Sequence, residues 1–584
     1  MKLFTILRYL PALLLVVLVK PVCAQVPEWK SVIGMQPGQS SACFVDVQAT
    51  ATDTNGNIYL AGQALGPVTF GTIALTSGGV GSMFVAKWNT STKSFIWVKQ
   101  AGGPDSRATA IAVSGSDVYV AGSFTFDVAM GGILLQNAGS TSTTGPRYSD
   151  GFVAKLTDAG SSASFTWALS VGANLSEEIN ALAVSNRNVY IGGQFSSTSL
   201  TIGSTQLDKA GSGSDVFVAK IADAGSTGSF SWAQRAGGQR NETLAGLAVS
   251  GSNVYITGDV ASTTATFGSS TLTVPANGSQ EVYVAKLVDT GSTGSFVWAQ
   301  QSGGTNVPFF KRATALALQG SSVYVTGFFQ GTANFGGTTL LSTGGGDIYV
   351  AKLTDTNTAG SFVWAQQAGG SGQDFAQALT ANASGIYVAG LFRSATAVFG
   401  NTTLTNTDAS GSSGDIFVSK LTEQGTTASF NWAQKAGGSS ARDDEATSLI
   451  LDGSNLYVAG GVIQSATFGT QTLPGSVDAE VGFLALLTES TSLATNTMSP
   501  LESVAVYPNP ARTAATVRLP AVPSATEARL TLTNSLGTIV YSQRVGLTGT
   551  STSIKLPLQG LSTGLYHLQL QAGSYYIQRS LAVQ

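Results

Sequence analysis

The sequence is poor in the residues that carry most catalytic chemistry. Its 584 residues include one histidine, His567, and two cysteines, Cys23 and Cys43. A zinc site built from clustered histidine and cysteine is therefore excluded, and a Ser-His-Asp or Cys-His nucleophile would depend entirely on His567. No other catalytic constellation is visible. We therefore expect neither a metal centre of this kind nor an enzyme.

Charge is scarce as well. Only 10% of the residues are charged and the net charge is −3, whereas about 25% are charged in typical soluble proteins. Without clustered lysine and arginine there is no electrostatic basis for binding nucleic acid. Glycine is abundant, with 70 residues, and such a composition favours strands and tight turns over long helices. The composition predicts an all-β protein.

The long apolar run that a membrane span requires is missing. The N-terminus has the basic residues Lys2 and Arg8, ten apolar residues at 10–19, and small residues before position 25. This layout is typical of a secretory signal peptide over residues 1–24, and it is shorter than the ~20 residues that cross a bilayer. We therefore predict export with no transmembrane segment. Cys43 would remain as a single buried cysteine, so that a disulfide within the chain is excluded.

Three columns of aromatic residues recur along residues 25–488. The first column is Tyr59, Tyr119, Tyr190, Tyr255, Tyr324, Tyr387 and Tyr457. The second is Phe84, Phe152, Phe217, Tyr283, Tyr349, Phe417 and Phe483. The third is Trp29, Trp97, Trp167, Trp232, Trp298, Trp364 and Trp432. Internal repetition of this kind predicts a repeat architecture.

Each repeat reads as four strands, which in the fifth repeat are 313–318, 322–328, 347–353 and 362–367. Small and large apolar residues alternate along the first strand, so one face of the sheet carries small side chains and the other carries large ones. Because both faces are apolar, both are expected to be covered, and the face with small side chains is the narrower one. This is typical of blades stacked around a central axis. The last repeat lacks a tryptophan strand, while the strand around Trp29 precedes the first repeat. Pairing the two would remove the exposed edges. We predict a seven-bladed β-propeller over 25–488, closed by this N-terminal strand.

These repeats carry the strings W-A-Q-x-A-G-G, V-Y-V-A-G-x-F and D-x-F-V-A-K. In this respect the region resembles the seven-bladed β-propeller repeats of secreted bacterial proteins. The resemblance implies the fold and export, but no defined activity.

The pattern stops after residue 488. Residues 489–503 are rich in serine and threonine and are expected to be a linker, and residues 504–584 alternate in short strands typical of a small β-sandwich. The strings at 506–510, 537–540 and 560–566 closely resemble the C-terminal sorting domain of the type IX secretion system. The residues that carry this resemblance are Tyr507, Pro508, Asn509, Pro510, Gly537, Gly560, Gly564 and Tyr566.

The resemblance implies a bacterium of the Bacteroidota type, with export to the periplasm and passage through the outer membrane by the type IX machinery. It further implies that the protein is then anchored at the cell surface or released. An ordinary sandwich-like binding module is the alternative for residues 504–584.

A column of carboxylates lies thirteen residues before the repeated tyrosines, at Asp46, Glu177, Glu242, Asp374 and Asp444. If the first strand is innermost, these side chains would ring one mouth of the channel and could bind Ca²⁺ or a cationic or hydroxylated ligand. The alternative is that each carboxylate caps a turn by accepting backbone N–H groups. Lys311 and Arg312 interrupt the ring, which argues against a symmetric metal site.

Other candidates carry weaker signals. Trp88 lies off the tryptophan column and is a candidate ligand-binding aromatic, whereas the column itself is expected to pack between blades. Acids such as Asp150 precede lysines such as Lys155 by five residues, an odd offset that puts them on opposite faces of the strand. We expect these lysines to pair between neighbouring blades or to be solvated. Adjacent acids such as Glu177 and Glu178 point apart, which disfavours a glycosidase pair.

The leading functional hypothesis is a non-catalytic binding or adhesion module, secreted or displayed on the outer-membrane surface, that binds polysaccharide or surface proteins. An extracellular carbohydrate-active enzyme with paired carboxylates is one alternative. A self-associating structural surface protein is another. No cofactor is expected, apart from Ca²⁺ as an open possibility.

Overall fold

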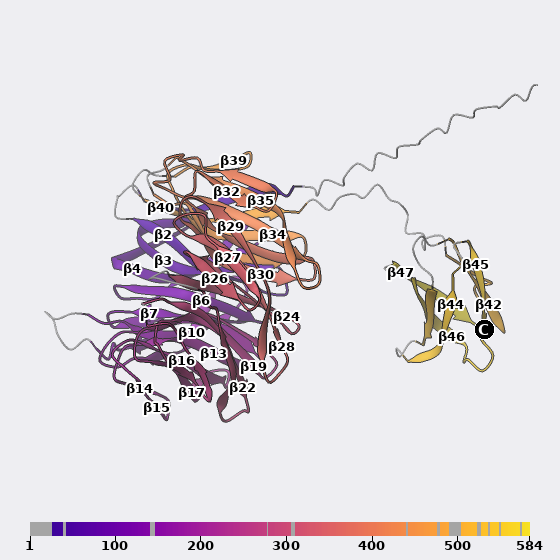
Figure 1. Ribbon diagram of the computed structural model, residues 1–584, viewed down its shortest axis with the longest axis horizontal. Helices are drawn as coiled ribbons and strands as arrows, with labels where there is room; N and C mark the ends of the chain where they lie inside the picture. Colours follow the sequence, from indigo (N-terminus) through magenta and orange to yellow (C-terminus); the bar gives the residue numbers. More distant parts are fainter. Residues whose placement is uncertain are drawn as a thin grey trace, which may run out of the picture. The chain divides into compact units, whose positions relative to one another are not determined.

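The computed structural model describes residues 26–38, 43–139, 147–276, 278–304, 310–439, 442–475, 479–489, 504–521, 527–534, 538–547, 550–572 and 575–584. The chain divides into two compact units, Met1–Ser490 and Thr491–Gln584 (Figure 1). The predicted signal peptide and most of the predicted linker lie outside the described residues.

In the described part of the first unit, the pairings between neighbouring strands form seven sets of four antiparallel strands. The first strands are β2 (Phe44–Thr52), β6 (Ser106–Ser114), β12 (Glu177–Ser185), β18 (Glu242–Ser250), β24 (Lys311–Gln319), β30 (Asp374–Asn382) and β36 (Glu445–Asp452). The second strands are β3 (Asn57–Phe70), β7 (Asp117–Phe124), β13 (Asn188–Phe195), β19 (Asn253–Val260), β25 (Ser322–Phe329), β31 (Gly385–Phe392) and β37 (Asn455–Ile463). The third strands are β4 (Ile73–Asn89), β10 (Asp150–Asp158), β16 (Asp215–Asp223), β22 (Glu281–Asp289), β28 (Asp347–Asp355), β34 (Asp415–Glu423) and β40 (Glu480–Thr488). The fourth strands are β5 (Ser94–Gln100), β11 (Ala163–Val171), β17 (Gly228–Gly238), β23 (Gly294–Gln301), β29 (Gly360–Gly370), β35 (Ala428–Gly437) and β1 (Glu28–Pro37).

Short hairpins connect the second and third strands of six sets. They are β8 (Val128–Met130) with β9 (Ile133–Leu135), β14 (Ser199–Ile202) with β15 (Thr205–Asp208), β20 (Ala265–Phe267) with β21 (Ser270–Leu272), β26 (Thr332–Phe335) with β27 (Thr338–Leu341), β32 (Thr396–Phe399) with β33 (Thr402–Thr405), and β38 (Ala466–Phe468) with β39 (Gln471–Leu473). In the first set the long strands β3 and β4 pair directly across this region.

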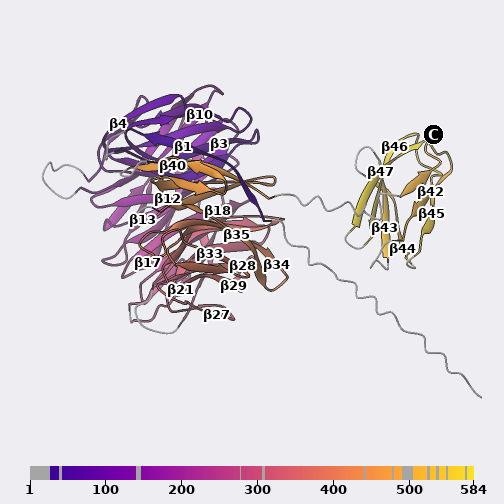
Figure 2. The same cartoon turned by 90° about the horizontal axis from the view of Figure 1, so that it is seen from above.

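The first strands contact one another in a cycle, in which each touches the next and β36 touches β2. The N-terminal strand β1 pairs with β40, and Figure 2 shows this indigo strand beside the orange one. The middle strands are covered on both faces, as in β10, where Phe152 and Val153 point to opposite sides and are both fully buried. This all-β arrangement fits a β-propeller. No helix in the described part of the chain is long and apolar enough to cross a membrane.

Glycine is required at the last position of the V-Y-V-A-G string for a steric reason. A β-bulge between Ala108 and Ala110 brings the Arg107 carbonyl oxygen against the second strand, where a methyl group added to Gly122 would lie 1.9 Å from it. The same bulge and the same close approach recur at Gly62, Gly193, Gly258, Gly327, Gly390 and Gly460. Only glycine fits this position.

The register corrects one of the predicted columns. Trp29 pairs with Leu487, as Phe165 pairs with Leu156, and therefore lies in the phenylalanine position of its set. Ser31, which pairs with Leu486, occupies the tryptophan position. The prediction that Trp29 belongs to the tryptophan column is wrong, because the column was matched by residue type without the strand register.

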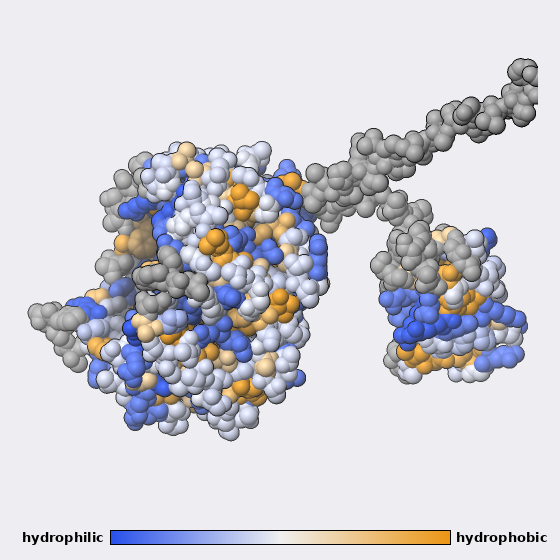
Figure 3. Space-filling model, viewed as in Figure 1, coloured by the Kyte–Doolittle hydropathy of each residue, from blue (hydrophilic) through white to orange (hydrophobic). Residues whose placement is uncertain are grey.

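The second unit packs two sheets around one apolar core. One sheet contains β41 (Ala505–Tyr507), β42 (Ala514–Leu519) and β45 (Thr552–Pro557), and the other contains β44 (Ile539–Gly546), β43 (Glu527–Thr533), β46 (Gly564–Ala572) and β47 (Tyr575–Val583). The sequence did not predict β42. The face of the first unit in Figure 3 is mostly of intermediate hydropathy, with few strongly hydrophilic clusters, as the scarcity of charge leads one to expect.

Candidate functional sites in the propeller and the tail

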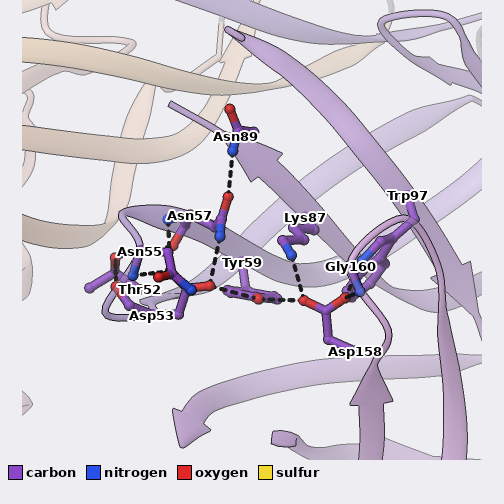
Figure 4. A network of polar contacts seen from close by, with 10 residues as sticks. All are labelled: Thr52, Asp53, Asn55, Asn57, Tyr59, Lys87, Asn89, Trp97, Asp158 and Gly160. Atoms are coloured by element: carbon purple, nitrogen blue, oxygen red, sulfur yellow. Dashed lines mark hydrogen bonds and ion pairs between the residues drawn. The ribbon is translucent and has the colours of Figure 1, made fainter. Parts of the chain in front are cut away.

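A buried polar network joins neighbouring sets of strands, and Figure 4 shows the first example. The carboxylate of Asp158 accepts hydrogen bonds from Lys87 Nζ at 2.6 Å, from the Tyr59 hydroxyl at 2.7 Å and from Trp97 Nε1 at 3.0 Å. Its three donors belong to the first set and Asp158 to the second. We call this arrangement the inter-blade clamp.

The clamp recurs at five further interfaces, where a lysine and a tryptophan of one set donate to an acid of the next set. The acids are Asp223, Asp289, Asp355, Glu423 and Glu489. The lysines thus pair between neighbouring sets, which was one of the two expectations. Five of the six acids follow a lysine by three residues, whereas Glu489 follows Leu486. The sequence analysis missed this acid column, although the recurring K-x-x-D/E spacing is its signal.

Electrostatics explains why the clamp stays ionised. Burial alone would raise the pKa of Asp223, but hydrogen bonds from Lys155, Tyr119 and Trp167 outweigh it and lower that pKa to about 2. Burial and the neighbouring carboxylate raise the pKa of the Tyr119 hydroxyl. The carboxylate is charged and the phenol is neutral over the physiological pH range, so these groups hold the sets together rather than exchanging protons.

The interface between the last set and the first lacks the clamp altogether. Ser31 stands in place of the tryptophan, Leu486 in place of the lysine and Thr90 in place of the acid. Trp88 takes the position of the leucine or isoleucine found in other sets and packs against Phe95 with the ring centroids 5.0 Å apart. Trp88 is 8% exposed and borders a cavity of about 430 Å³, also lined by Ile33. The structure places this predicted aromatic in apolar packing at the interface between the last set and the first.

Four of the predicted carboxylates are fully buried and accept backbone hydrogen bonds. Glu177 accepts from the amides of Ala173 and Ser197, at 2.8 and 3.1 Å. Glu242, Asp374 and Asp444 accept from two amides each in the same way. This is the turn-capping arrangement that the sequence left open as the alternative. The structure places these four carboxylates at the interfaces between neighbouring sets of strands.

Asp46 does not belong to the same column. It pairs with Gln63, one residue before the Val47–Gly62 pair, and so corresponds to Arg107 rather than to Ser106. The turn at Asp53–Asn57 is one residue longer than the corresponding turn of the second set. The residue that lies thirteen positions before Tyr59 is therefore not equivalent to the residue thirteen positions before the other tyrosines. Asp46 accepts a hydrogen bond from Gln48 at 2.6 Å and lies 3.5 Å from Arg107.

A polar pocket of about 370 Å³ lies at the start of the strands of the last two sets. Its lining residues are Arg393, Ser412, Arg442, Asp443, Glu445, Ile463 and Glu480. The guanidinium of Arg393 donates two hydrogen bonds to Asp443, of which the Nε bond is 2.9 Å long. Burial and the neighbouring carboxylates of Asp46 and Glu445 raise the pKa of Glu480 to about 8. The pocket therefore places the ion pair of Arg393 and Asp443 beside an acid whose pKa is raised.

The carboxylate column of the repeats included Asp444, whose two neighbours line this pocket, but the sequence analysis missed Arg393 and Glu480, because neither belongs to a repeated column. Adjacent acids here diverge, since Asp444 is buried in a turn while Asp443 and Glu445 line the pocket. Within the described ranges, no group of three or more histidine, cysteine, aspartate or glutamate side chains could hold a metal ion.

In the tail, the Tyr507–Pro510 segment is exposed and is attached to the last strand, β47. The side chain of Asn509 donates to the Ser580 carbonyl at 2.8 Å and accepts from the Ala582 amide at 2.9 Å. Tyr507 is 48% exposed. Pro508, Asn509 and Pro510 are exposed as well, so the whole segment lies on the surface of this unit.

The turn before β46 is closed by a tyrosine. Gly560 has a φ of 86°, which favours glycine, and Gly564 begins the strand. The buried Tyr566 then donates its hydroxyl hydrogen bond back to the Ser562 carbonyl at 2.8 Å. Gly537, also predicted as part of the sorting motif, lies outside the described residues.

Residues 505–584 match the family described as the secretion system C-terminal sorting domain. The C-terminal domain is a type IX secretion sorting domain. It directs the chain through the type IX machinery, so that the protein is secreted and is attached to the outer-membrane surface or released. The predicted recognition and localisation are confirmed.

No curated protein matches the chain in sequence. Three solved structures are similar at 10% identity each: a protein assigned as 6-phosphogluconolactonase from Bacteroides uniformis, the Dos1 propeller, and a Trypanosoma rangeli sialidase in complex with 2,3-difluorosialic acid. The matches cover 72%, 79% and 95% of this chain and 97%, 95% and 89% of the others, with TM-scores of 0.36, 0.34 and 0.30. Likeness at this level carries no argument about activity.

Proposed function

We propose that the first unit is a closed seven-bladed β-propeller exported by a bacterium of the Bacteroidota. The cycle of contacts between the first strands and the pairing of β1 with β40 support closure. A ring closed by an N-terminal strand has no free sheet edge, which suits a domain that must remain folded outside the cell.

Within this ring, the protein acts as a non-catalytic binding or adhesion module. The pocket of Arg393, Asp443, Glu445 and Glu480 carries the proposal, because charged side chains of both signs line this one cavity. Convergent donors and acceptors suit a hydroxylated ligand, and a surface polysaccharide has that chemistry. Other buried acids of the ring accept hydrogen bonds from backbone amides, as Glu177 does, or belong to the inter-blade clamps, as Asp223 does.

A glycan array probed with the mature chain, residues 25–584, tests this role. We expect selective, saturable binding that Arg393→Ala weakens by about ten-fold or more, because a charge-assisted hydrogen bond contributes ~1.5–3 kcal/mol. Arg312→Ala is the matched control, since Arg312 is an arginine with a 56% exposed side chain away from the pocket. Equal binding by the two variants would contradict the proposal, and a blank array with concentration-dependent self-association would favour a structural surface protein.

One observation favours an alternative, an extracellular carbohydrate-active enzyme. The pKa of Glu480, raised to about 8, keeps this group protonated at neutral pH in a pocket that also contains Asp443. An acid and a carboxylate held in different protonation states are what glycoside hydrolysis requires. If this function is correct, Glu480→Gln will abolish turnover of an array-positive glycan while leaving its binding intact. Turnover that is equal in the wild-type protein and in Glu480→Gln, or absent from both, would refute it.

A further inference from the structure

The interface between the last set of strands and the first, here called the clamp-free interface, differs from the clamped ones in more than the clamp. At five clamped interfaces a glycine or alanine begins the fourth strand and pairs with the clamp acid, as Gly294 pairs with Asp289. The tryptophan of the preceding set packs on this small residue where it is glycine. A methyl group added to Gly294 would lie 2.7 Å from the Trp232 ring, so a larger side chain does not fit there.

At the clamp-free interface both partners of this packing are replaced. Ser31 takes the tryptophan position. By register, Lys93 takes the position of Gly294. Because no indole ring of the preceding set covers this position, it accommodates a long side chain. Lys93 is exposed, and its ammonium has no ion pair or hydrogen bond within the part of the chain that the structure describes.

The turn that carries Lys93 is well defined. The side chain of Asn89 accepts hydrogen bonds from the Thr92 amide at 2.8 Å and from the Thr92 hydroxyl at 3.1 Å. The hydroxyls of Thr92 and Ser94 are also hydrogen-bonded, at 2.8 Å. Between them Lys93 has a φ of 52°, which is uncommon for a residue other than glycine. The lysine side chain therefore starts from a fixed point.

A cavity of about 430 Å³ borders Lys93, between β1 of the last set and β5 of the first. Ile33, Trp88 and Phe95 give it an apolar wall, and the two aromatic side chains are each 8% exposed. Small-molecule sites in proteins usually span ~300–1,000 Å³ and combine such a wall with a few polar groups. The cavity thus has the size and the kind of lining that a small ligand requires.

The lining favours an anion that carries an aromatic ring. Among the described residues that line the cavity, Lys93 carries the one charge, and there is no acid or amide side chain. A sugar would leave most of its hydroxyls without a partner here, whereas an aromatic ring packs well against Trp88 and Phe95. The hydroxyls of Thr72 and Ser94 also line the cavity and can donate hydrogen bonds to a carboxylate.

We propose that this cavity binds an aryl carboxylate, with the ring against Trp88 and Phe95 and the carboxylate at Lys93. The ligand supplies beside Lys93 the aromatic ring that the chain itself supplies at the clamped interfaces. No residue of this site lines the pocket of Arg393, so the two sites bind their ligands independently.

Titration calorimetry of the mature chain, residues 25–584, with benzoate, 4-hydroxycinnamate and indole-3-acetate tests the proposal without any substitution. We expect at least one of these carboxylates to bind saturably at one site per chain. Its neutral amide should bind about three-fold more weakly, because the amide cannot form an ion pair with the exposed Lys93. Failure of all three carboxylates to saturate up to ~10 mM would overturn the proposal. Amides that bind as tightly as the acids would contradict the role of Lys93.

A substitution of the lysine locates the site. Lys93→Met removes the charge and keeps an unbranched side chain, so this variant should bind the carboxylate as weakly as the wild-type protein binds the amide. Lys99→Met is the matched control, since Lys99 is a lysine of β5 that does not line the cavity, and it should not change the affinity. Arg393→Ala should leave the affinity unchanged as well, which separates this result from that of the glycan array. Equal affinities of Lys93→Met and the wild-type protein would contradict the assignment.

A variant with a filled interface gives the complementary test. The triple change Ser31→Trp, Trp88→Leu and Lys93→Gly copies the residues between the third and fourth sets. It should abolish carboxylate binding in a protein that still unfolds cooperatively. A folded triple variant that binds like the wild-type protein would place the ligand elsewhere and refute the site. A triple variant of higher unfolding midpoint, together with no binding by the wild-type protein, would identify the cavity as a packing defect.

Discussion

A chain that ends at residue 490 is expected to fold but to remain in the periplasm. The sorting domain, residues 505–584, is the part that the type IX machinery recognises, whereas the first unit forms its own cores and its own strand pairing. Deletion of residues 491–584 should therefore abolish surface display and release, and the truncated protein should accumulate inside the outer membrane. Cell fractionation with immunoblotting of the periplasmic, surface and medium fractions measures this directly.

The matched control transfers the sorting domain to another protein instead of deleting it. Residues 491–584 fused to a fluorescent protein with a signal peptide should carry that reporter across the outer membrane. Within the fusion, Asn509→Ala should reduce export, because it releases the exposed Pro-Asn-Pro segment from Ser580 and Ala582 of the last strand. A truncated propeller that reaches the medium at the level of the intact chain would refute this role of the tail.

The strands and the tail motif could be predicted because they depend on local patterns. Alternating apolar residues set the strands, and the expected strands of the fifth repeat lie within β24, β25, β28 and β29. Counting residues failed where turn length or strand register differs between blades. One additional residue in the Asp53–Asn57 turn misplaced Asp46, and the register of β1 put Trp29 into another column.

The contacts between blades were harder to predict because their partners lie far apart in the sequence. Asp158 meets Lys87 from a different blade, so that the clamp is invisible until the blades are stacked. The interface between the last set and the first shows this clearly, since Leu486 and Thr90 each look like an isolated departure from the repeat. By register, Leu486 takes the lysine position and Thr90 the acid position of one interface, so the loss of the lysine accompanies the loss of its acid. The pocket residues Arg393 and Glu480 occur once, so no periodicity could reveal them.

Replacing Asp289 with asparagine should be among the most destabilising single changes in the propeller. Its carboxylate accepts from Lys220 Nζ at 2.7 Å, from the Tyr190 hydroxyl at 2.7 Å and from Trp232 Nε1 at 3.0 Å. Asparagine keeps the shape but leaves the buried ammonium of Lys220 without a counter-charge, which costs about 3–5 kcal/mol. Denaturant unfolding of the mature chain should show this loss. Asp208→Asn, at an exposed acid at the end of β15, should change stability by no more than ~0.5 kcal/mol.

Two further measurements separate the clamp from a general packing effect. Adding Lys220→Met to Asp289→Asn removes the unpaired charge, so the double variant should be more stable than the single one. The hydrogen bonds lower the pKa of Asp289 to about 2 against burial, from its ordinary value of 3.8. The stability that this ionised group contributes is therefore complete above pH 3.8 and is lost as the pH falls towards 2. The difference in the free energy of unfolding between the wild-type protein and Asp289→Asn should therefore become smaller over the same pH range. A difference that does not change with pH would show that the loss comes from shape rather than from charge.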